Sequence, residues 1–503
     1  MIRNLLRNSF SNVAIVFLKL AVTFIMAPLI VHALGNYDYG IWEIVFSIVG
    51  YMGLLEFGLQ PALVRNVSRY SALGDKSSLD RIYSTSLFCM GLVGFFVALL
   101  LMGWALFGPD LLSKSGEDVT RYSLFLIIVA AQVFVTFIGH VFLSFHHGFQ
   151  RYHFTNLIVA ANTIVGSAIL YYFLKHGHGL IALALVNSIG IAVKFCIFGV
   201  FLKFRTLGSF SCKYKDVSLE TLKDLLSFGL KSFVLGISSR ISSSTDSIVI
   251  GSILGPVFVT FYMIPVNLVR HAGNLIRTIT LNFMPFFSHL QARQEEDLVK
   301  DAFIISSRYV AGLSIILFLG ICMVGTDFIA IWMGPSYAQR GRTVLYIIAF
   351  ASLIPMLNPF HGRLLTSAGR HGILAKIRPA QALLNLLLSL ALIHIMGKEG
   401  VALATLIAAL IAAPFVLVAV CRYIEISVFR FLKDVLVPHI VPALFTLASY
   451  FLFLRHISLT HYMAIINVSL ALAFVYTAAF FVFSIPVKEK RFLFTKLRAL
   501  FVS

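Results

Sequence analysis

About fourteen apolar stretches, each long enough to cross a lipid bilayer, follow one another almost without interruption from Phe10 to Ile485. Hydrophobic residues make up 59% of the chain, and charged residues make up only 12%. A chain of this composition has too little polar surface to fold as a water-soluble globule. The sequence therefore predicts a polytopic membrane protein that uses lipid as its main solvent.

The apolar stretches predict helices rather than the strands of a β-barrel. Barrel strands are short and alternate in polarity, whereas runs such as Phe95–Trp104 and Ala402–Val420 are long and continuous. A helix also satisfies its own backbone hydrogen bonds in lipid. An all-α fold is therefore expected, with spans at 10–34, 39–60, 84–107, 119–145, 155–174, 179–202, 228–252, 256–281, 303–325, 343–367, 372–396, 400–421, 435–454 and 461–484.

The polar connections are too short to hold a soluble catalytic domain. The longest are 61–83, 203–227 and 282–302. The chain has no Walker A sequence and no spacing typical of metal ligands, so neither ATP hydrolysis nor a metal site is expected. We predict that the protein is not an enzyme and that it needs no cofactor.

Net charge is +19, which in a soluble protein would indicate nucleic acid as a partner. Here most Lys and Arg residues fall in alternate loops, as the positive-inside rule describes, and no nucleic-acid partner is expected. The rule places both termini in the cytoplasm. The first apolar segment is too long for a removed signal peptide, so we interpret it as a retained helix.

An internal repeat, offset by about 220 residues, relates the two halves of the chain. The segment around Leu34-Gly35 matches the segment around Leu254-Gly255 in its order of helix, Leu-Gly turn, helix and polar loop. Because six helices per copy is an even number, the repeat is parallel, with a cavity at the seam. The predicted organisation is a six-helix lobe at 1–202, a linker at 203–227, a second lobe at 228–421, an added helix pair at 435–484 and a basic tail at 485–503.

The segment 256–281 carries the clearest polar pattern within the membrane. Asn267, Arg270, Asn274 and Arg277 are spaced by three, four and three residues, so they share one face of a helix. Hydrogen bonds between helices could account for the asparagines alone. Two arginines on the same stripe favour an aqueous cavity that receives anions, because guanidinium groups bind phosphate oxygens in pairs.

Other cations lie deep in predicted spans. They are Lys19, Arg240 and Arg378, the last on a weaker stripe with Gln381. A charge at the bilayer centre costs roughly 2.5–3.5 kcal/mol, so it usually faces water or a partner. Snorkelling towards the interface is the alternative for Lys19. We expect all three residues to bind substrate together with the stripe.

Three carboxylates, Glu43, Glu56 and Asp246, lie within or close to predicted spans. A carboxylate in lipid can carry a proton or a sodium ion, or it can act as a counter-ion for a nearby cation. Both alternatives stay open. A simpler reading of Glu56 pairs it with Arg65 or Arg69, which follow it at the cytoplasmic end of the same span.

The N-terminal block resembles the polysaccharide flippases of the multidrug/oligosaccharidyl-lipid/polysaccharide exporter superfamily. The residues that carry the resemblance are Pro28-Leu29-Ile30-Val31, Leu34-Gly35, Tyr39-Gly40-Ile41-Trp42 and Gly53-Leu54-Leu55-Glu56-Phe57-Gly58-Leu59. The block from Phe228 to Ser288 is similar to the start of the second lobe of that family. The resemblance covers the whole helical layout.

The resemblance implies a flippase that moves undecaprenyl-diphosphate-linked oligosaccharide from the cytoplasmic to the periplasmic leaflet of a bacterial inner membrane. It also implies alternating access, membrane lipids as partners, and an ion gradient or membrane potential as the driving force. A polysaccharide polymerase and a chain-length regulator are further expected partners.

Two alternatives belong to the same superfamily. A cation-coupled drug antiporter would need a cavity dominated by carboxylates and aromatic rings, against which the arginine stripe argues. A peptidoglycan-precursor flippase shares the added helix pair, which there forms a groove for the lipid tail. In that branch, however, the first helix is richer in arginine, whereas here it carries only Lys19.

Overall fold

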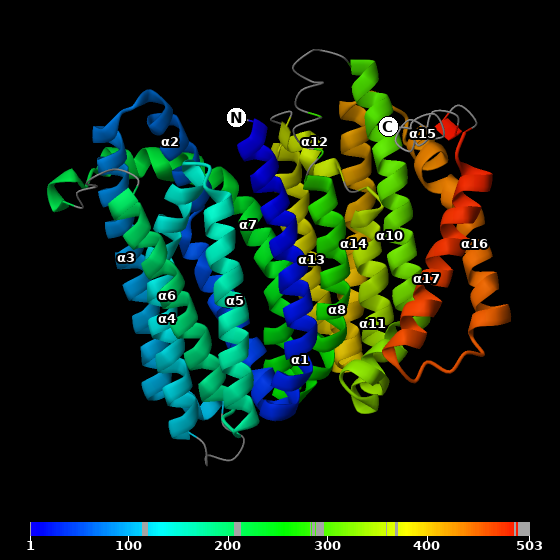
Figure 1. Ribbon diagram of the computed structural model, residues 1–503, viewed down its shortest axis with the longest axis horizontal. Coiled ribbons are helices and arrows are strands. Elements are labelled where there is room, and N and C mark those ends of the chain that lie inside the picture. The colour runs from blue at the N-terminus through cyan, green and yellow to red at the C-terminus, as the bar shows by residue number, and fades with distance from the viewer. Residues whose placement is uncertain are drawn as a thin grey trace. The chain divides into compact units, whose positions relative to one another are not determined.

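The computed structural model describes residues 2–112, 119–205, 213–281, 283, 287, 296–358, 360–367, 371–486 and 489–490. Helices make up nearly all of this part of the chain, which contains no strand (Figure 1). The predicted all-α fold is therefore confirmed. Part of the predicted linker, 206–212, and most of the predicted tail, 485–503, lie outside the described residues.

Contacts between helices divide the chain into two compact units, Met1–Thr260 (unit 1) and Phe261–Ser503 (unit 2). The helices of unit 1 are α1 (Ile2–Met52), η1 (Gly53–Glu56), α2 (Leu59–Leu73), α3 (Lys76–Phe107), η2 (Pro109–Leu112), α4 (Val119–Gly148), α5 (Tyr152–Lys175), α6 (Leu180–Arg205), η3 (Tyr214–Asp216), α7 (Leu219–Ile253) and the first residues of α8 (Pro256–Leu281). The division into two six-helix lobes, a linker, a helix pair and a tail stays a prediction.

Unit 2 contains the rest of α8 and the helices that follow it. These are α10 (Glu296–Trp332), α11 (Pro335–Met356), α12 (His361–Ser367), α13 (His371–Met396), α14 (Lys398–Tyr423), α15 (Val428–Phe431), η4 (Leu432–Leu436), η5 (Val437–His439), α16 (Ile440–Ser449), η6 (Tyr450–Leu454), α17 (Tyr462–Ala479) and η7 (Phe480–Ser484). In Figure 1, α16 and α17 stand beside α10, and contacts join all three helices.

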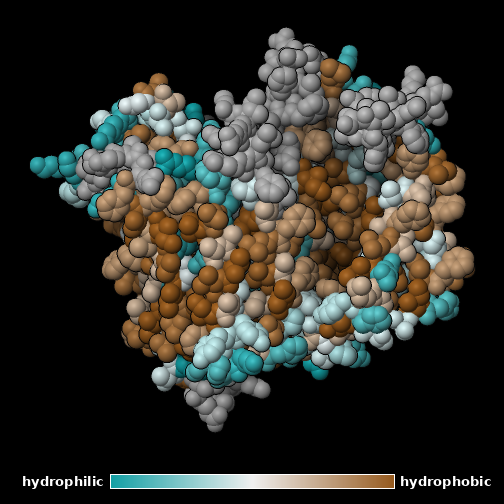
Figure 2. All heavy atoms as spheres, in the orientation of Figure 1, coloured by the Kyte–Doolittle hydropathy of each residue, from teal (hydrophilic) through white to brown (hydrophobic). Residues whose placement is uncertain are grey.

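Ten helical stretches of the described chain are long and apolar enough to cross a membrane. One of them, Ala14–Glu56, covers most of two predicted spans, 10–34 and 39–60. The predicted spans 228–252 and 256–281 are also helical, but their serines, arginines and asparagines keep them out of the ten. Apolar side chains cover the middle of the helices, and hydrophilic side chains gather at the helix ends (Figure 2). The chain is therefore a multi-pass membrane protein, and the number of fourteen crossings stays a prediction.

One predicted connection is helical, and one predicted span is wrong because it is interrupted. The connection 61–83 contains most of α2, whose buried face of Leu59, Leu63 and Val67 follows a helical spacing. The span 343–367 is interrupted, since α11 ends at Met356 and α12 begins only at His361. Pro359 follows Asn358 in the sequence, and a proline disfavours the helical conformation of the residue before it.

The glycines of the two Leu-Gly turns in the predicted repeat both have a positive φ. Gly35 has φ 76° and Gly255 has φ 98°, both in the left-handed region that favours glycine. The first turn is a kink within α1, and the second separates α7 from α8. The Thr260 hydroxyl donates to the Asn36 carbonyl oxygen over 2.6 Å, so the start of α8 is bonded to the first turn.

A second close contact holds α2 against α7 in unit 1. Between η1 and α2, Phe57 and Gly58 both take left-handed conformations, with φ 48° and 72°. A Cβ atom added to Gly58 would lie 2.3 Å from the carbonyl oxygen of Gly229, which is far inside van der Waals contact. Only a residue without a side chain lets the two backbones approach this closely.

Helix starts in unit 1 follow ordinary capping rules. Asp75 caps α3, because its carboxylate accepts hydrogen bonds from the backbone N–H of Ser78 (3.0 Å) and from its hydroxyl (2.6 Å). These two bonds lower the pKa of the Asp75 carboxyl. Ser218 caps α7 in the same manner, since its hydroxyl oxygen accepts from the N–H of Thr221 over 3.3 Å. Local hydrogen bonding therefore fixes the first residues of α3 and α7.

Candidate functional site

The polar segment of α7 contacts α1 within unit 1. The Tyr51 hydroxyl of α1 is hydrogen-bonded to the Thr245 hydroxyl of α7. A Cβ atom on Gly50 would lie 3.3 Å from Nη1 of Arg240 and 3.3 Å from the Ser244 hydroxyl. The Arg240 guanidinium therefore lies against the backbone of α1, in a space that a side chain at position 50 would fill.

Asp246 is buried on the same helix, and its carboxylate acts electrostatically on the Tyr51 hydroxyl. Glu43 lies further along α1 and accepts a hydrogen bond of 2.8 Å from the Tyr39 hydroxyl, one helical turn before it. Asp246 and Glu43, two of the predicted ion-coupling carboxylates, thus have different surroundings within unit 1.

Lys19 of α1 has a second cation as a neighbour. Its ammonium group and that of Lys194, on α6, are close enough to repel each other. Lys194 also lies over the Phe195 ring, with Nζ 4.3 Å from the ring centroid. In the part of the chain that the structure describes, neither lysine forms an ion pair with a carboxylate. Two such cations on facing helices can receive an anion.

Glu56 has a partner that the sequence reasoning did not find. Its Oε1 atom lies 2.5 Å from Nδ1 of His140, on α4. Gln60, on α2, donates from Nε2 to Glu56 Oε2 over 2.6 Å, and the same Nε2 atom lies 2.9 Å from His140 Nδ1. The simpler reading is wrong, because Arg65 instead lies over the Phe228 ring, 4.5 Å from its centroid.

The first two residues of the predicted arginine stripe contact each other on one face of α8. Nη1 of Arg270 donates to Oδ1 of Asn267 over 3.1 Å. Arg270 and Arg277 have exposed side chains, whereas Asn267 and Asn274 are half-buried. The neutral Asn267 therefore orients Arg270 without cancelling its charge.

Arg378, on α13, is held by two neutral groups. Its Nη1 donates to Oε1 of Gln381 over 3.0 Å, and its Nη2 lies 2.8 Å from Nε2 of His361, on α12. The other ring nitrogen of His361 contacts the carbonyl oxygen of Asn358. This contact makes Nδ1 the donor and leaves Nε2 to accept from Arg378.

The charges of Arg277 and Arg378 repel each other across unit 2. Since both are arginines, deprotonation cannot relieve the repulsion. An anion between α8 and α13 would relieve it, and no carboxylate forms an ion pair with either guanidinium among the described residues. Unit 2 thus brings together two of the predicted substrate-binding cations.

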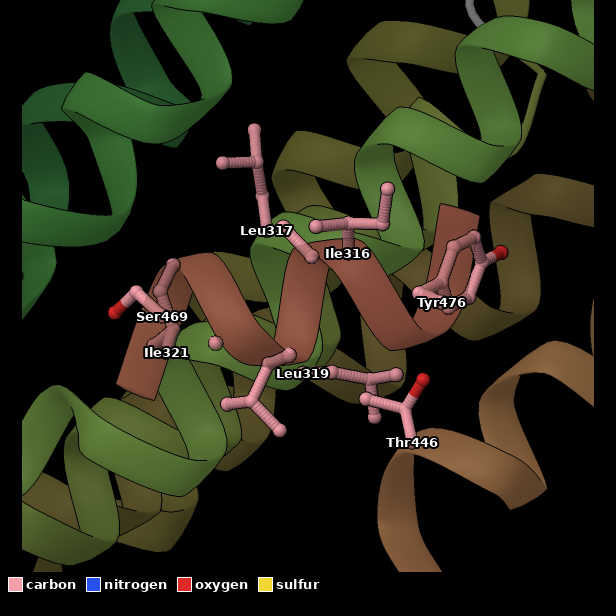
Figure 3. Close-up of a pocket in the computed structure, with 10 residues that line it drawn as sticks. Ile316, Leu317, Leu319, Ile321, Thr446, Ser469 and Tyr476 are labelled. Carbon is pink, nitrogen blue, oxygen red and sulfur yellow. The ribbon is translucent and has the colours of Figure 1, made fainter. Parts of the chain in front are cut away.

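A cavity of about 290 Å³ lies between α10, α16 and α17 in unit 2. Most of its lining is aliphatic, with Ile316, Leu317, Leu319 and Ile321 from α10 (Figure 3). The Thr446 hydroxyl donates to a backbone carbonyl oxygen, and the Tyr476 hydroxyl is 2.9 Å from His439 Nδ1. These bonds occupy the polar groups of two lining residues, so the cavity offers an apolar ligand a mainly hydrocarbon surface.

The sequence reasoning missed three residues of these clusters. His140 is a lone imidazole within the apolar segment Phe137–Phe142, which is the signal that could have identified it. The positions of Lys194 near Lys19 and of His361 against Arg378 depend on the tertiary structure, which no local pattern predicts.

Comparison with known proteins places the chain in a family. Residues 5–291 match the family described as polysaccharide biosynthesis protein. A Shigella flexneri protein named "Putative O-antigen transporter" is 20% identical over 376 residues, which cover 74% of this chain and 87% of that protein.

Two solved structures share the fold. The lipid II flippase MurJ in an inward closed conformation superposes with a TM-score of 0.70 at 14% identity, covering 96% of this chain and 99% of MurJ. An inward-facing multidrug transporter of the MATE family, in the MOP superfamily, gives 0.68 at 14% identity, covering 80% and 94%. The names of these relatives describe transporters and a flippase.

The family match covers more than half of the chain, and the whole helical layout agrees with it. The predicted resemblance is therefore confirmed. The chain belongs to the polysaccharide biosynthesis protein family, and it shares its fold with the MATE and MurJ structures.

Proposed function

We propose that the protein flips undecaprenyl-diphosphate-linked oligosaccharide from the cytoplasmic to the periplasmic leaflet, for the synthesis of O-antigen, capsule or exopolysaccharide. The family and the relative named for O-antigen transport support this substrate class. Movement follows alternating access of two lobes, as expected for a parallel repeat. The protein resides in a bacterial inner membrane with both termini in the cytoplasm.

The observation that carries the proposal is the set of arginines held by neutral partners. Arg270 is oriented by Asn267, and Arg378 by Gln381 and His361. A buried cation paired with a carboxylate would have its charge compensated within the protein. These cations keep their charge for a ligand, and a diphosphate offers several oxygens in the geometry that guanidinium groups bind. Lys19, Arg240, Asn274 and Arg277 complete the proposed substrate-binding set.

The cavity between α10, α16 and α17 supports a substrate with an apolar tail. Its lining is mainly aliphatic and belongs to the added helix pair and α10. An isoprenoid chain gains free energy by contact with such a surface, by roughly 25 cal/mol per Å² of area removed from water. The same chemistry would suit a peptidoglycan precursor, whose tail is also isoprenoid, so the cavity favours a lipid-linked substrate over a drug.

The test is complementation of a bacterial strain that lacks its own oligosaccharide flippase, scored by surface polysaccharide. Wild type should restore the polysaccharide, Arg270→Ala should not, and Arg270→Lys should restore part of it if charge is the main requirement. Arg340→Ala serves as the control, because Arg340 lies over the Phe261 ring outside the proposed set. Immunoblots of membranes confirm equal expression.

Three results would redirect the proposal. Rescue by Arg270→Ala as strong as wild type would remove that residue from the site. Failure of expressed wild type to rescue, together with raised resistance to cationic drugs, would favour the antiporter alternative. Failure combined with rescue of a strain depleted of its lipid II flippase would favour the peptidoglycan-precursor alternative.

A further inference from the structure

The segment 343–367, which is apolar enough to predict a membrane span, is broken at Asn358. The helix α11 ends at Met356, and α12 begins only at His361. Non-helical backbone at membrane depth occurs where it is buried in protein or lines a water-filled cavity, because lipid cannot satisfy its polar groups. In transporters, broken helices of this kind commonly form the binding site. The break is therefore a candidate for direct contact with the substrate.

The side-chain amide of Asn358 is buried and has no hydrogen-bond partner. Neither its Oδ1 atom nor its Nδ2 atom forms a hydrogen bond in the described part of the chain, although both are shielded from solvent. Such a group destabilises the folded protein, because it has given up its hydrogen bonds to water and gained none in exchange. Native proteins contain few of these groups, and positions that break a folding rule are often functional. The fold thus leaves one donor group and one acceptor of this amide unused.

The backbone of Asn358 connects the break to the proposed substrate-binding cations. Its carbonyl oxygen contacts Nδ1 of His361, and Nε2 of the same ring lies 2.8 Å from Nη2 of Arg378. The charge of Arg378 in turn repels that of Arg277. A single imidazole therefore separates Asn358 from a guanidinium that belongs to the proposed diphosphate-binding set.

The arginine face of α8 meets the same break. Gly273 comes three residues after Arg270 and four before Arg277, so it lies on their face of the helix. A Cβ atom added to Gly273 would lie 2.7 Å from Cε of Met356, the last residue of α11. The break therefore lies beside the cations of α8 as well as beside Arg378.

We propose that the Asn358 amide recognises the sugar of the substrate, an inference that rests on the proposed flippase function. In a diphosphate-linked oligosaccharide the first sugar is bonded directly to the diphosphate, so a group next to the diphosphate-binding arginines meets that sugar. A side-chain amide has an acceptor oxygen and two N–H donors, which match adjacent sugar hydroxyls or an acetamido group. The amide distinguishes sugars by hydrogen bonding, whereas the arginines bind the diphosphate that all such lipids share.

Binding requires a local rearrangement, because both amide atoms are buried in this conformation. Met356, two residues before Asn358, has an unbranched side chain that repacks easily. A sugar that enters at the break supplies the hydrogen bonds that the fold does not. The free energy lost by burying the amide is therefore recovered when the sugar binds.

The first experiment needs no ligand. Purified full-length Asn358→Leu should unfold about 1–3 °C above wild type, because it removes two buried polar atoms that have no partner. Asn385→Leu is the matched control, since Asn385 is also buried but its Oδ1 accepts hydrogen bonds from the hydroxyls of Thr405 (3.3 Å) and Ser389 (3.4 Å). This control should unfold below wild type. A lower unfolding temperature for Asn358→Leu would show that its amide serves the fold, and would overturn the proposal.

The second experiment measures selectivity by native mass spectrometry of the full-length protein. The probes are undecaprenyl diphosphate and the same lipid bearing N-acetylglucosamine, glucose or galactose. Wild type should bind at least one sugar-bearing lipid about tenfold more tightly than undecaprenyl diphosphate, as expected for two hydrogen bonds. Asn358→Leu should lose this preference and keep its affinity for undecaprenyl diphosphate, whereas Arg378→Gln should bind every probe more weakly. Asn385→Leu should keep the preference.

The outcomes separate this inference from the proposed function. If wild type binds none of the probes, the flippase function fails and the sugar site fails with it. If wild type binds all of them equally, the flippase function stands and the sugar site is wrong. Asn358→Ala, which removes the amide without adding bulk, replaces Asn358→Leu if the latter does not elute as a folded protein. A preference that the folded variant retains would overturn the role of Asn358.

Discussion

Two carboxylates of unit 1 and two arginines of unit 2 have partners of different kinds. In unit 1, carboxylates meet bases: Asp38 pairs with Arg121, and Glu56 with His140. In unit 2, Arg270 and Arg378 are oriented by neutral amides and an imidazole. A carboxylate paired with a base has its charge compensated within the protein, whereas an arginine with a neutral partner stays cationic. Arg270 and Arg378 therefore keep a positive charge that a ligand could meet.

The two units also differ in how their helices are held together. In unit 1, α2 and α7 approach through the backbones of Gly58 and Gly229. In unit 2, the added helices are bound to α10 by side chains: His439 Nε2 is 2.9 Å from the Arg308 carbonyl oxygen, and Arg308 pairs with Glu489. A close backbone contact leaves no space for an added side chain, whereas side-chain contacts can be removed one hydrogen bond at a time.

The largest effect is expected from reversing charge in the arginine stripe. Arg277→Glu places a carboxylate beside Arg378, which compensates that cation and repels a diphosphate. Transport should fall about a hundredfold or more, since the change removes one charge-assisted contact and adds a repulsion. Surface polysaccharide in the complementation strain measures it. Arg340→Glu is the control. If both variants restore surface polysaccharide equally, the contrast drawn between the two units is wrong.

Gly58→Ala should destabilise unit 1 most strongly. The added Cβ atom would lie 2.3 Å from the Gly229 carbonyl oxygen, and the residue would have to keep φ 72°. The expected cost is about 3 kcal/mol, from overpacking and the left-handed conformation together. Thermal unfolding in detergent provides the measurement. Gly91→Ala is the matched control, since a Cβ there meets no atom within 4 Å; similar unfolding temperatures would contradict the close contact.

Asp38→Asn should have a smaller effect on the same unit. Asp38 is buried, and it binds Arg121 as well as the Tyr122 hydroxyl (2.9 Å). Because Asn keeps one acceptor and Arg121 is partly exposed, the loss should be about 2 kcal/mol, or a Tm about 2–5 °C lower. Arg270→Gln in unit 2 should leave Tm unchanged. The reverse order would contradict the view that the charge of Asp38 is compensated within the protein and that of Arg270 is not.

Tyr476→Phe should have the smallest effect. It removes one hydrogen bond, between the Tyr476 hydroxyl and His439 Nδ1, and keeps the ring. The expected loss of stability is about 1 kcal/mol. Differential scanning fluorimetry of the purified protein would detect it, with Tyr462→Phe as a control for an exposed tyrosine of the same helix. A loss of stability as large as that expected for Gly58→Ala would show that the side-chain contacts of unit 2 also stabilise it cooperatively.

Much of the fold could be predicted from the sequence, because hydropathy and turn residues act locally. Every predicted span is mostly helical in the described chain, although 343–367 is interrupted between Met356 and His361. Gly35 and Gly255 both have a positive φ, as expected of glycines in turns. The helix α2 could not be predicted from hydropathy, since its apolar face is narrow. An amphipathic helix of this kind resembles a polar loop when only mean hydropathy is considered.

Less of the candidate site than of the fold could be predicted from the sequence. The stripe on α8 follows from helical spacing within one segment, and the arginines of α8 and α13 do come under each other's charge. The partner of Glu56 is 84 residues away, on a helix whose rotation no sequence pattern reports. Arg65 is closer to Glu56 in the sequence, but its guanidinium forms a cation–π contact with the Phe228 ring instead.

The contact between Gly58 and Gly229 has a consequence for how this family should be surveyed by mutagenesis. A library that samples every substitution would show both codons as intolerant, with the same depletion as a residue that binds substrate. Neither position has a side chain with which to bind anything. Intolerance at these two codons would therefore report the distance between two backbones, and only a separate assay of protein abundance would tell it apart from a lost ligand contact.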